Sequence, residues 1–315
     1  MTSIHAEVSI YYWIGFFIFV LAMLSLDLMV FQKKTHEIKF KEAFGWTVFW
    51  ISLALLFNLL VLYQFGSQKA LEFITAYLIE ESLSVDNLFV FLMIFSYFAV
   101  PKNLEHRVLF WGILGAIIMR GIFIAAGTAL VKRFDWTLYI FGVLLLYASI
   151  KMFFHNESEV HPERNPVIKL FSKFFPSVRE YHGSKFLIRK EGRLFATPLL
   201  LVLVTIESSD IIFAVDSIPA VLSISHDPFI VFTSNIFAVL GLRALFFCIS
   251  GMLNIFSRLK EGVAFILLFV GTKMLINKFV HISTGLSLSV ITITLILAIV
   301  ASIIENKLKG EENAG

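Results

Sequence analysis

Long apolar stretches, separated by short polar segments, run through the chain from end to end. Each stretch is about 20 residues or longer, the length that an α-helix needs to cross a bilayer. The strands of a membrane barrel would instead read as short segments of alternating polarity. The pattern therefore predicts an all-α polytopic membrane protein with about nine transmembrane helices. The predicted spans are 10–31, 43–65, 70–99, 108–131, 134–154, 194–222, 229–256, 262–280 and 285–304.

The composition agrees with this pattern. Of the 315 residues, 58% are hydrophobic and only 16% are charged, against roughly 25% charged residues in soluble domains. The apolar excess is spread over the whole chain, which predicts a single transmembrane domain over 1–315. The first stretch follows no positive charge and is too long for a cleaved signal peptide, so we expect it to remain as a span. Cys248 is the one cysteine, which excludes an internal disulfide.

Lysine and arginine are distributed unevenly between the two sets of loops. If the N-terminus lies outside, the inside loops hold nineteen of these residues and the outside loops hold four. The four outside residues are Lys69, Lys132, Arg133 and Lys278. The positive-inside rule therefore predicts an outside N-terminus and a cytoplasmic C-terminus.

The segment 155–193 is the one long polar loop. It mixes both charge signs with three prolines and a few phenylalanines, and we predict a cytoplasmic linker, partly helical, that lies near the lipid headgroups. Two interpretations stay open, a plain connector between two halves and a regulatory segment.

A weak internal repeat links two parts of the chain. The segments 84–89 and 208–213 both fit S-x-D-x-(L/I)-F. The markers that recur in order are Asp86, Arg120 and Lys151 in the first unit and Asp210, Arg243 and Lys273 in the second. Their spacings are 34 and 31 residues in the first unit and 33 and 30 in the second. A repeat of three helices inverts the second unit in the membrane, as in many secondary transporters; chance similarity in an apolar chain is the alternative.

The repeat predicts a division of the chain. The parts are two N-terminal spans over 10–65, a first repeat over 70–154, the linker 155–193, a second repeat over 194–280 and a last span over 285–305.

Acidic residues are unexpectedly frequent within the predicted spans. The seven carboxylates are Asp27, Glu80, Glu81, Asp86, Glu207, Asp210 and Asp216. Arg120, Arg243 and Lys273 lie opposite them, and they leave a deficit of about four positive charges. Each ionised group at mid-bilayer costs roughly 2.5–3.5 kcal/mol on insertion scales. One or two bound divalent cations would balance the deficit, although Glu80 and Asp27 could equally form structural ion pairs with the arginines.

The donor atoms favour a hard cation. Glu207 and Asp210 are three residues apart and share a helix face. Pro219 follows Asp216 by three residues, which predicts a local helix break with free carbonyl oxygens. Carboxylate, amide and carbonyl oxygens suit magnesium, calcium and manganese, whereas copper and zinc favour Cys, His and Met. All eight histidines lie in loops or at span ends.

The predicted metal ligands are Glu81, Asp86, Asn87, Glu207, Asp210, Asp216 and Asn235. The predicted charge-balancing residues are Arg120, Arg243 and Lys273, and Asn58 and Ser234 are further oxygen donors.

Three segments, 77–87, 207–220 and 227–243, resemble the TerC family, in particular its Alx-like branch. The resemblance covers nearly all of 10–305. It implies a multi-pass protein of the bacterial inner (cytoplasmic) membrane, in a family named for tellurium resistance and associated with manganese export and metal homeostasis. It also places the acidic motif residues of the family on Glu81, Asp86, Glu207, Asp210 and Asp216.

We therefore expect a secondary transporter that exports a hard divalent cation, with Mn²⁺ favoured by the resemblance. Moving a +2 ion outward costs about 4.6 kcal/mol per 100 mV, so export needs coupling, for which exchange with protons is suitable. The expected partners are the lipid bilayer, the metal ion and protons, with no nucleic acid, and the oligomeric state is open. No tightly bound cofactor is expected.

Other functions are less well supported. The absence of mid-membrane His pairs, of H-E-x-x-H and of a Gly-rich dinucleotide motif argues against an enzyme. A membrane accessory or assembly protein, or an indirect redox modulator without transport, stays open, as does a passive channel. An accessory protein should tolerate Asp210→Asn, whereas a transporter should not.

Overall fold

The computed structural model describes residues 9–31, 40–134, 136–154, 176–178, 180–190, 193–250, 258–276, 278–280 and 282–312. Within these ranges it describes the side chains of all residues except 27–31, Asp86 and 306–312.

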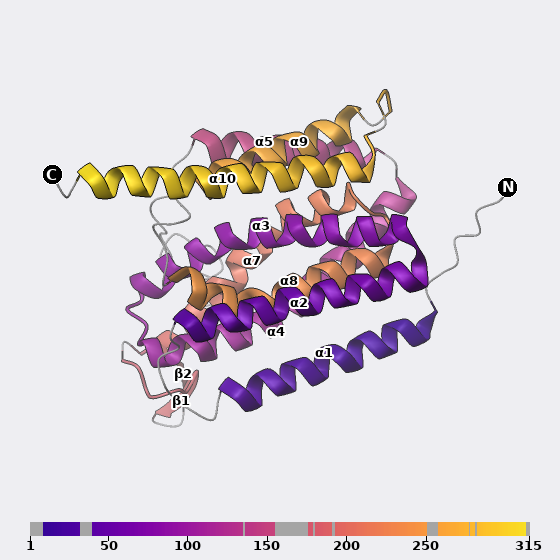
Figure 1. Cartoon of the computed structure of the whole chain (residues 1–315). Helices are drawn as coiled ribbons and strands as arrows, with labels where there is room; N and C mark the ends of the chain where they lie inside the picture. The colour runs from indigo at the N-terminus through magenta and orange to yellow at the C-terminus, as the bar shows by residue number, and fades with distance from the viewer. Residues whose placement is uncertain are drawn as a thin grey trace.

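Long helices that run side by side make up almost all of the described chain (Figure 1). They are α1 (Ile10–Phe31), α2 (Phe40–Phe65), α3 (Ser67–Tyr97), α4 (Lys102–Arg133), α5 (Thr137–Phe154), α7 (Pro198–Leu222), α8 (Pro228–Ser250), α9 (Leu259–Ile276) and α10 (Thr284–Glu312). Each of the nine predicted spans overlaps one of these helices. The mostly helical, polytopic architecture is therefore confirmed.

Six of the described helices, α2, α4, α5, α7, α8 and α10, are long and apolar enough to cross a membrane. Two of the other three contain too many charged residues: α3 contains several carboxylates and Lys69, and α9 contains Lys260, Glu261 and Lys273. Helix α1 has 22 residues, and its part with described side chains, Ile10–Leu26, is apolar. The total of nine crossings stays a prediction.

The segment before α7 corrects the start of the predicted sixth span. That span was predicted to begin at 194, but Arg193–Ala196 is a strand, β2, which pairs antiparallel with β1, Leu187–Lys190, and α7 starts only at Pro198. The end of the linker therefore forms a β-hairpin. Residues 155–175, 179, 191 and 192 of the linker lie outside the described residues, so its partly helical character stays a prediction.

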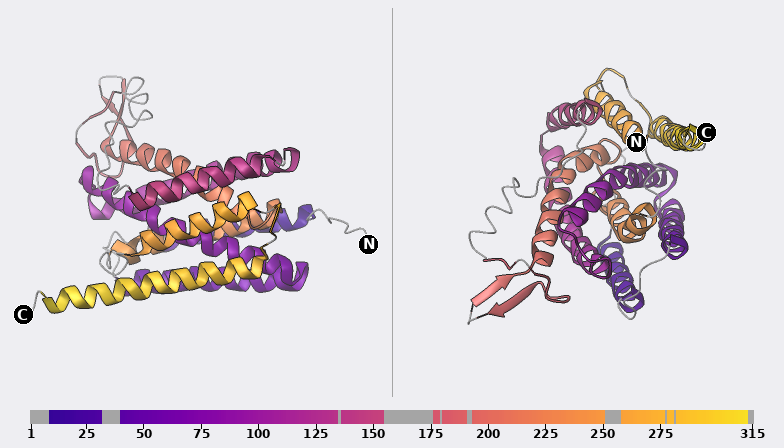
Figure 2. Two further views of the ribbon diagram at one scale, coloured as in Figure 1. Left: turned by 90° about the horizontal axis from the view of Figure 1, so that it is seen from above. Right: turned by 90° about the vertical axis from the view of Figure 1, so that its left-hand side faces the viewer.

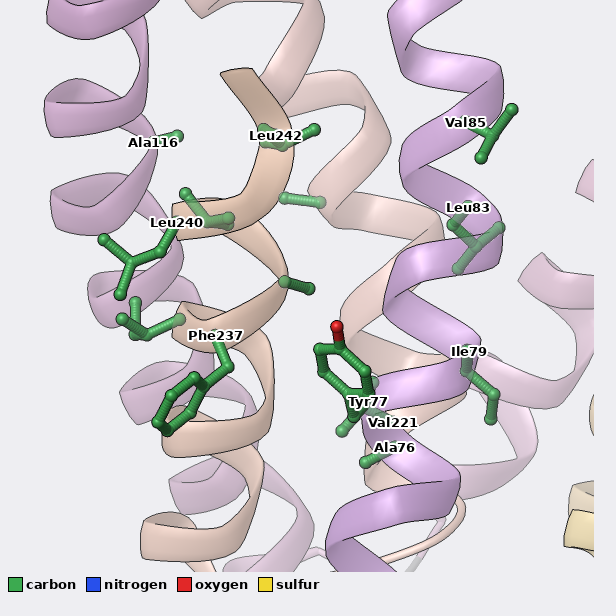
Figure 3. Close-up of a cluster of buried hydrophobic side chains, with 14 of the residues drawn as sticks. Ala76, Tyr77, Ile79, Leu83, Val85, Ala116, Val221, Phe237, Leu240 and Leu242 are labelled. Atoms are coloured by element: carbon green, nitrogen blue, oxygen red, sulfur yellow. The ribbon is translucent and has the colours of Figure 1, made fainter. Parts of the chain in front are cut away.

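The helix α8 is the centre of the bundle. Nearly all of its residues are buried, and it packs against α2, α3 and α4. Figure 2 shows these helices surrounding it in the view along the bundle. Figure 3 shows the apolar side chains between α3, α4 and α8, with Tyr77 of α3 lying between α3 and α8. A helix that is apolar on all sides is typical of such a central position.

Two glycines let α5 and α9 approach closely. A methyl group on Gly142 would lie 3.1 Å from the carbonyl oxygen of Gly271, and one on Gly271 would lie 3.0 Å from that of Gly142. The Ser149 hydroxyl donates across the same pair to the Ala264 carbonyl oxygen at 2.8 Å. Small residues at such crossings are a common means of helix association in membranes.

The helix pairs follow the order that an inverted repeat would produce. With α3, α4 and α5 matched to α7, α8 and α9, the contact of α3 with α8 corresponds to that of α4 with α7. Because α5 is matched to α9, their mutual contact is left unchanged when the two units are exchanged. The inverted repeat itself stays a prediction.

The expected helix break near Pro219 is wrong. Helix α7 continues through Pro219 to Leu222, and the Ser223 amide donates to the Pro219 carbonyl oxygen at 3.0 Å. Because proline has no N–H, residue 219 donates no hydrogen bond to the Val215 carbonyl oxygen one turn earlier, although the helix itself continues.

Candidate functional site

A buried ion cluster joins three helices in the middle of the molecule. Arg120 of α4 donates through Nη1 to Glu80 Oε2 of α3 at 2.6 Å. Its Nη2 and Nε donate to Asp210 Oδ1 and Oδ2 of α7 at 3.0 and 3.3 Å. Arg120, Glu80 and Asp210 are 0%, 1% and 3% exposed. The planar guanidinium thus holds one carboxylate in a fork and the other by a single short bond.

Helix α8 completes the cluster. Asn235 Nδ2 donates to Glu80 Oε1 at 2.6 Å, so each oxygen of the Glu80 carboxylate has a partner. The Asn235 Oδ1 atom is buried and has no hydrogen-bond partner among the described residues. A buried acceptor without a partner is costly, and this oxygen belongs to the amide that contacts the Glu80 carboxylate.

The cluster is not electrically neutral by itself. Two carboxylates face one guanidinium, which leaves one net negative charge if both acids are ionised. An uncompensated charge in a low-dielectric interior is strongly unfavourable. An additional cation near the cluster would balance this charge.

A small cavity adjoins Asp210, where α3, α4, α7 and α8 meet. Its volume is about 10 Å³, and Asp210 is the one polar residue that lines it. The apolar residues around it are Phe91, Leu109, Gly112, Ile113, Ala116, Ile206 and Leu242. Such a space is close to the smallest that holds one water molecule.

A second carboxylate lies next to the ion cluster in sequence but faces another way. Glu81 Oε1 accepts a 2.6 Å hydrogen bond from the Tyr77 hydroxyl, one turn earlier in α3. A methyl group on Gly241 of α8 would lie 3.6 Å from the same oxygen. Glu81 therefore points toward α8, whereas Glu80 points toward Arg120.

A third carboxylate uses the space left by a glycine. Glu207 of α7 is half-buried, and a methyl group on Gly115 of α4 would overlap its carboxylate. Glu207 lies three residues before Asp210, so both acids face α4 as their spacing predicts.

The other predicted site residues are not part of the ion cluster in the described contacts, or their side chains lie outside the described residues. Asn87 and Arg243 are buried and Asp216 is half-buried. Lys273 is buried and donates to the Ser287 hydroxyl of α10 at 2.9 Å. The side chains of Asp86 and Asp27 lie outside the described residues.

The described carboxylates do not form a ready-made metal centre. No group of three or more His, Cys, Asp and Glu in the described part of the chain is placed to hold a metal ion. In this conformation Arg120, not a metal, is the cation between Glu80 and Asp210.

Sequence reasoning missed part of this arrangement. An ion pair of Glu80 with an arginine was one of the two interpretations left open, and Arg120 is that arginine. The meeting of Glu80 and Asp210 at the same guanidinium was not predicted. The four-residue spacing of Tyr77 and Glu81 is a signal for their hydrogen bond. Nothing in the sequence singled out Gly115.

Comparisons of the sequence with known proteins show similarity to other integral membrane proteins. A family model described as "Integral membrane protein TerC family" matches residues 65–310. An uncharacterized membrane protein of Myxococcus xanthus is 50% identical over 295 residues, which is 94% of this chain and 92% of the relative.

Two further relatives have the provisional name membrane-bound redox modulator Alx. The protein of Salmonella typhi is 47% identical over 90% of this chain and 92% of its own length. That of Escherichia coli (strain K12) is 46% identical over 89% and 90%. No solved structure matches the chain.

Proposed function

This chain belongs to the TerC family of integral membrane proteins, and from that premise we propose that it exports a hard divalent cation, Mn²⁺ in particular, in exchange for protons. The observation that carries the proposal is the buried cluster in which one guanidinium, that of Arg120, bridges the carboxylates of Glu80 and Asp210. A structural ion pair needs one acid for each base. The additional carboxylates, Glu81 and Glu207, lie on the same two helices, α3 and α7, within a turn of the cluster.

In the proposed mechanism Arg120 occupies the place of the substrate while no metal is bound. A divalent ion that reaches Asp210 competes with the guanidinium for the same two oxygens, Oδ1 and Oδ2. The ion wins when it also gains oxygens that Arg120 does not use, and the buried Oδ1 of Asn235 is one of these. Displacement of Arg120 then separates α4 from α7, which supplies the conformational change that alternating access requires.

Protons complete the cycle in this proposal. After the ion leaves, the carboxylates of Glu81 and Glu207 are buried or half-buried without a nearby base among their described contacts. Protonation removes their charge and with it the cost of burial. Two protons that enter for each divalent ion that leaves make the exchange electroneutral, so that the membrane potential does not oppose it.

The donor set supports a hard cation. The candidate ligands offer carboxylate and amide oxygens from Asp210, Glu207, Glu81 and Asn235, and one thiol, that of Cys248, is present in the chain. Such oxygens suit Mg²⁺, Ca²⁺ and Mn²⁺. The choice of Mn²⁺ among these rests on the resemblance to the family. The proposal involves no covalent turnover and no tightly bound cofactor.

A second candidate function rests on the relatives that are named as redox modulators. In that case the chain would act on redox balance or on other membrane proteins without moving ions, and the charged cluster would be purely structural. An indirect redox effect through metal balance is compatible with both.

The deciding experiment measures Mn²⁺ flux into or out of proteoliposomes with an imposed pH gradient. The wild type is compared with Asp210→Asn and Asp86→Asn, and with Glu261→Gln as a matched control, because Glu261 is an exposed acid on α9. We expect flux that follows the gradient in the wild type and in the control and is lost in the two Asn variants. Correctly inserted wild-type protein with no flux above empty vesicles would favour the second candidate function.

A further inference from the structure

The β-hairpin of the linker is held against the helices by specific contacts. The Tyr181 hydroxyl donates to the Phe98 carbonyl oxygen, in the turn between α3 and α4, at 2.8 Å. The Phe186 ring lies 6.4 Å from that of Trp111, and the Arg107 guanidinium lies 5.5 Å from the centre of the Phe186 ring. The hairpin therefore has a fixed position beside the first turns of α4.

These contacts also define its depth. Trp111 is nine residues after the start of α4 at Lys102, about 14 Å along the helix axis. Helix α4 has 32 residues and extends about 48 Å, which exceeds the roughly 30 Å of the hydrocarbon core. If α4 is centred, about 9 Å of it lies outside the core at each end, so the contacts of the hairpin extend from the headgroup level at the α3–α4 turn to Trp111, about 5 Å inside the core.

The hairpin extends to the side of the bundle. In the view along the helices β1 and β2 project beyond the outline of the bundle, and the perpendicular view agrees (Figure 2). The hairpin lies at the same end as the α3–α4 turn and the end of α10 (Figure 1).

The exposed side chains combine apolar and basic groups. Leu187 and Leu194 are 42% and 53% exposed. Leu194 is opposite Arg189 in the register, so leucine and arginine share a face. The basic residues of the segment are Lys185, Arg189, Lys190 and Arg193, against Glu180 and Glu191. Tyr181, His182, Lys185, Arg189, Lys190 and Glu180 are among the residues that line a hollow of about 850 Å³ on the hairpin.

We propose that this hairpin binds the anionic headgroups of the bilayer in which the protein lies, with its leucines in the interface and its basic residues on the lipid phosphates. Exposed leucines are stable at the depth of the headgroups, and a basic residue near an anionic surface is attracted by it. The inference does not depend on the transported substrate.

The test places a fluorescent probe on the hairpin of the full chain in vesicles. Leu194→Cys is labelled with an environment-sensitive dye; Cys248 is buried, and unmodified protein measures its background labelling. The vesicles contain phosphatidylcholine alone or with phosphatidylglycerol. Quenchers carried on the lipid tails and iodide in the water report on which side the probe lies.

We expect lipid-borne quenching that is about twofold or more stronger in the anionic vesicles. The combined change Arg189→Gln, Lys190→Gln and Arg193→Gln should reduce the lipid-borne quenching to the level in the neutral vesicles. The control change Lys132→Gln and Arg133→Gln should leave the quenching unchanged, because these two exposed basic residues lie next to the turn between α4 and α5.

A second measurement needs no charge variant. Raising the salt from about 0.1 M to about 1 M shortens the screening length from about 10 Å to about 3 Å and should weaken the lipid-borne quenching in anionic vesicles alone. Equal quenching in both lipids, or quenching by iodide only, would overturn the proposal. Loss of the lipid signal on addition of inorganic phosphate at constant ionic strength would instead show a free-phosphate site and overturn the lipid assignment.

Discussion

Arg120 has two carboxylate partners and no contact with water, which makes it the residue on which the interior depends most. Its five N–H donors are fixed in one plane, and three of its nitrogens are used by Glu80 and Asp210. A lysine could replace the charge but not the fork. The cluster is therefore defined by geometry as much as by charge.

We expect Arg120→Gln to destabilise the protein by about 3–5 kcal/mol, because it leaves two buried carboxylates without their counter-charge. Thermal unfolding of the purified protein in detergent measures this. Adding Asp210→Asn to the same chain should recover part of the loss, since the second change removes one of the abandoned charges. Additive effects of the two substitutions would contradict the coupling.

Gly115→Ala should separate function from stability. The new methyl group would overlap the Glu207 carboxylate, which is the far end of a flexible side chain and can move away. We therefore expect little change in the unfolding temperature and a fall in Mn²⁺ flux of about tenfold or more, as displaced ligating groups are costly to function.

The control for this prediction is Gly45→Ala, where the new methyl group meets no atom within 4 Å. Unchanged flux in Gly115→Ala would mean that the position of Glu207 is not used in transport.

At this scale the sequence predicted the types of residue but not their partners. Both Glu80 and Glu81 stand out as acids in an apolar span, yet neighbours in a helix point about 100° apart. Which one faces Arg120 depends on the rotation of α3 in the bundle, and no local pattern encodes it. The excess of acidic over basic residues in the spans was visible in the sequence. The close approach of the Glu207 carboxylate to Gly115 depends on how α4 and α7 pack.

Among the elements, the helices were predictable and the hairpin was not. Each long apolar stretch became a helix because an isolated backbone in lipid must satisfy its own hydrogen bonds. The hairpin gave a weaker signal, because each four-residue strand contains one strong strand former, Ile188 in β1 and Phe195 in β2. The surrounding charges and prolines concealed it.

The crossing of α5 and α9 should be sensitive to a single methyl group. In Gly271→Ala the added carbon would lie 3.0 Å from the Gly142 carbonyl oxygen and 3.2 Å from the Leu146 amide nitrogen. Backbone atoms cannot move aside cheaply, so we expect a loss of about 1–3 kcal/mol in the free energy of unfolding.

Gly45→Ala is again the matched control, because it is also a glycine within a helix but has open space around it. It should be neutral or stabilising by up to about 1 kcal/mol. Equal effects of the two substitutions, measured by chemical or thermal unfolding, would show that the close approach of α5 and α9 does not limit stability.

On the scale of the whole molecule, the helices alternate in direction, so that α1 begins at one end of the bundle and α10 finishes at the other (Figure 1). The charge distribution in the loops then predicts which end faces the cytoplasm.

Cysteine accessibility tests this orientation. We expect Lys132→Cys and Lys278→Cys to react with a membrane-impermeant maleimide in intact spheroplasts, and Arg189→Cys and Arg258→Cys to react only after lysis. All four positions are exposed, whereas the native Cys248 is buried. Reaction of Arg189→Cys or Arg258→Cys in intact spheroplasts would reverse the assignment.

The central position of α8 has a consequence for biogenesis. The ribosome completes α2, α3 and α4 long before α8, so its neighbours enter the membrane while the space between them still lacks its occupant. Until α8 arrives, Glu80 lacks the amide of Asn235 that satisfies its second oxygen. We therefore expect a chain that terminates before Pro228 to leave the second oxygen of Glu80 without this partner, and to be degraded faster in cells than the full chain.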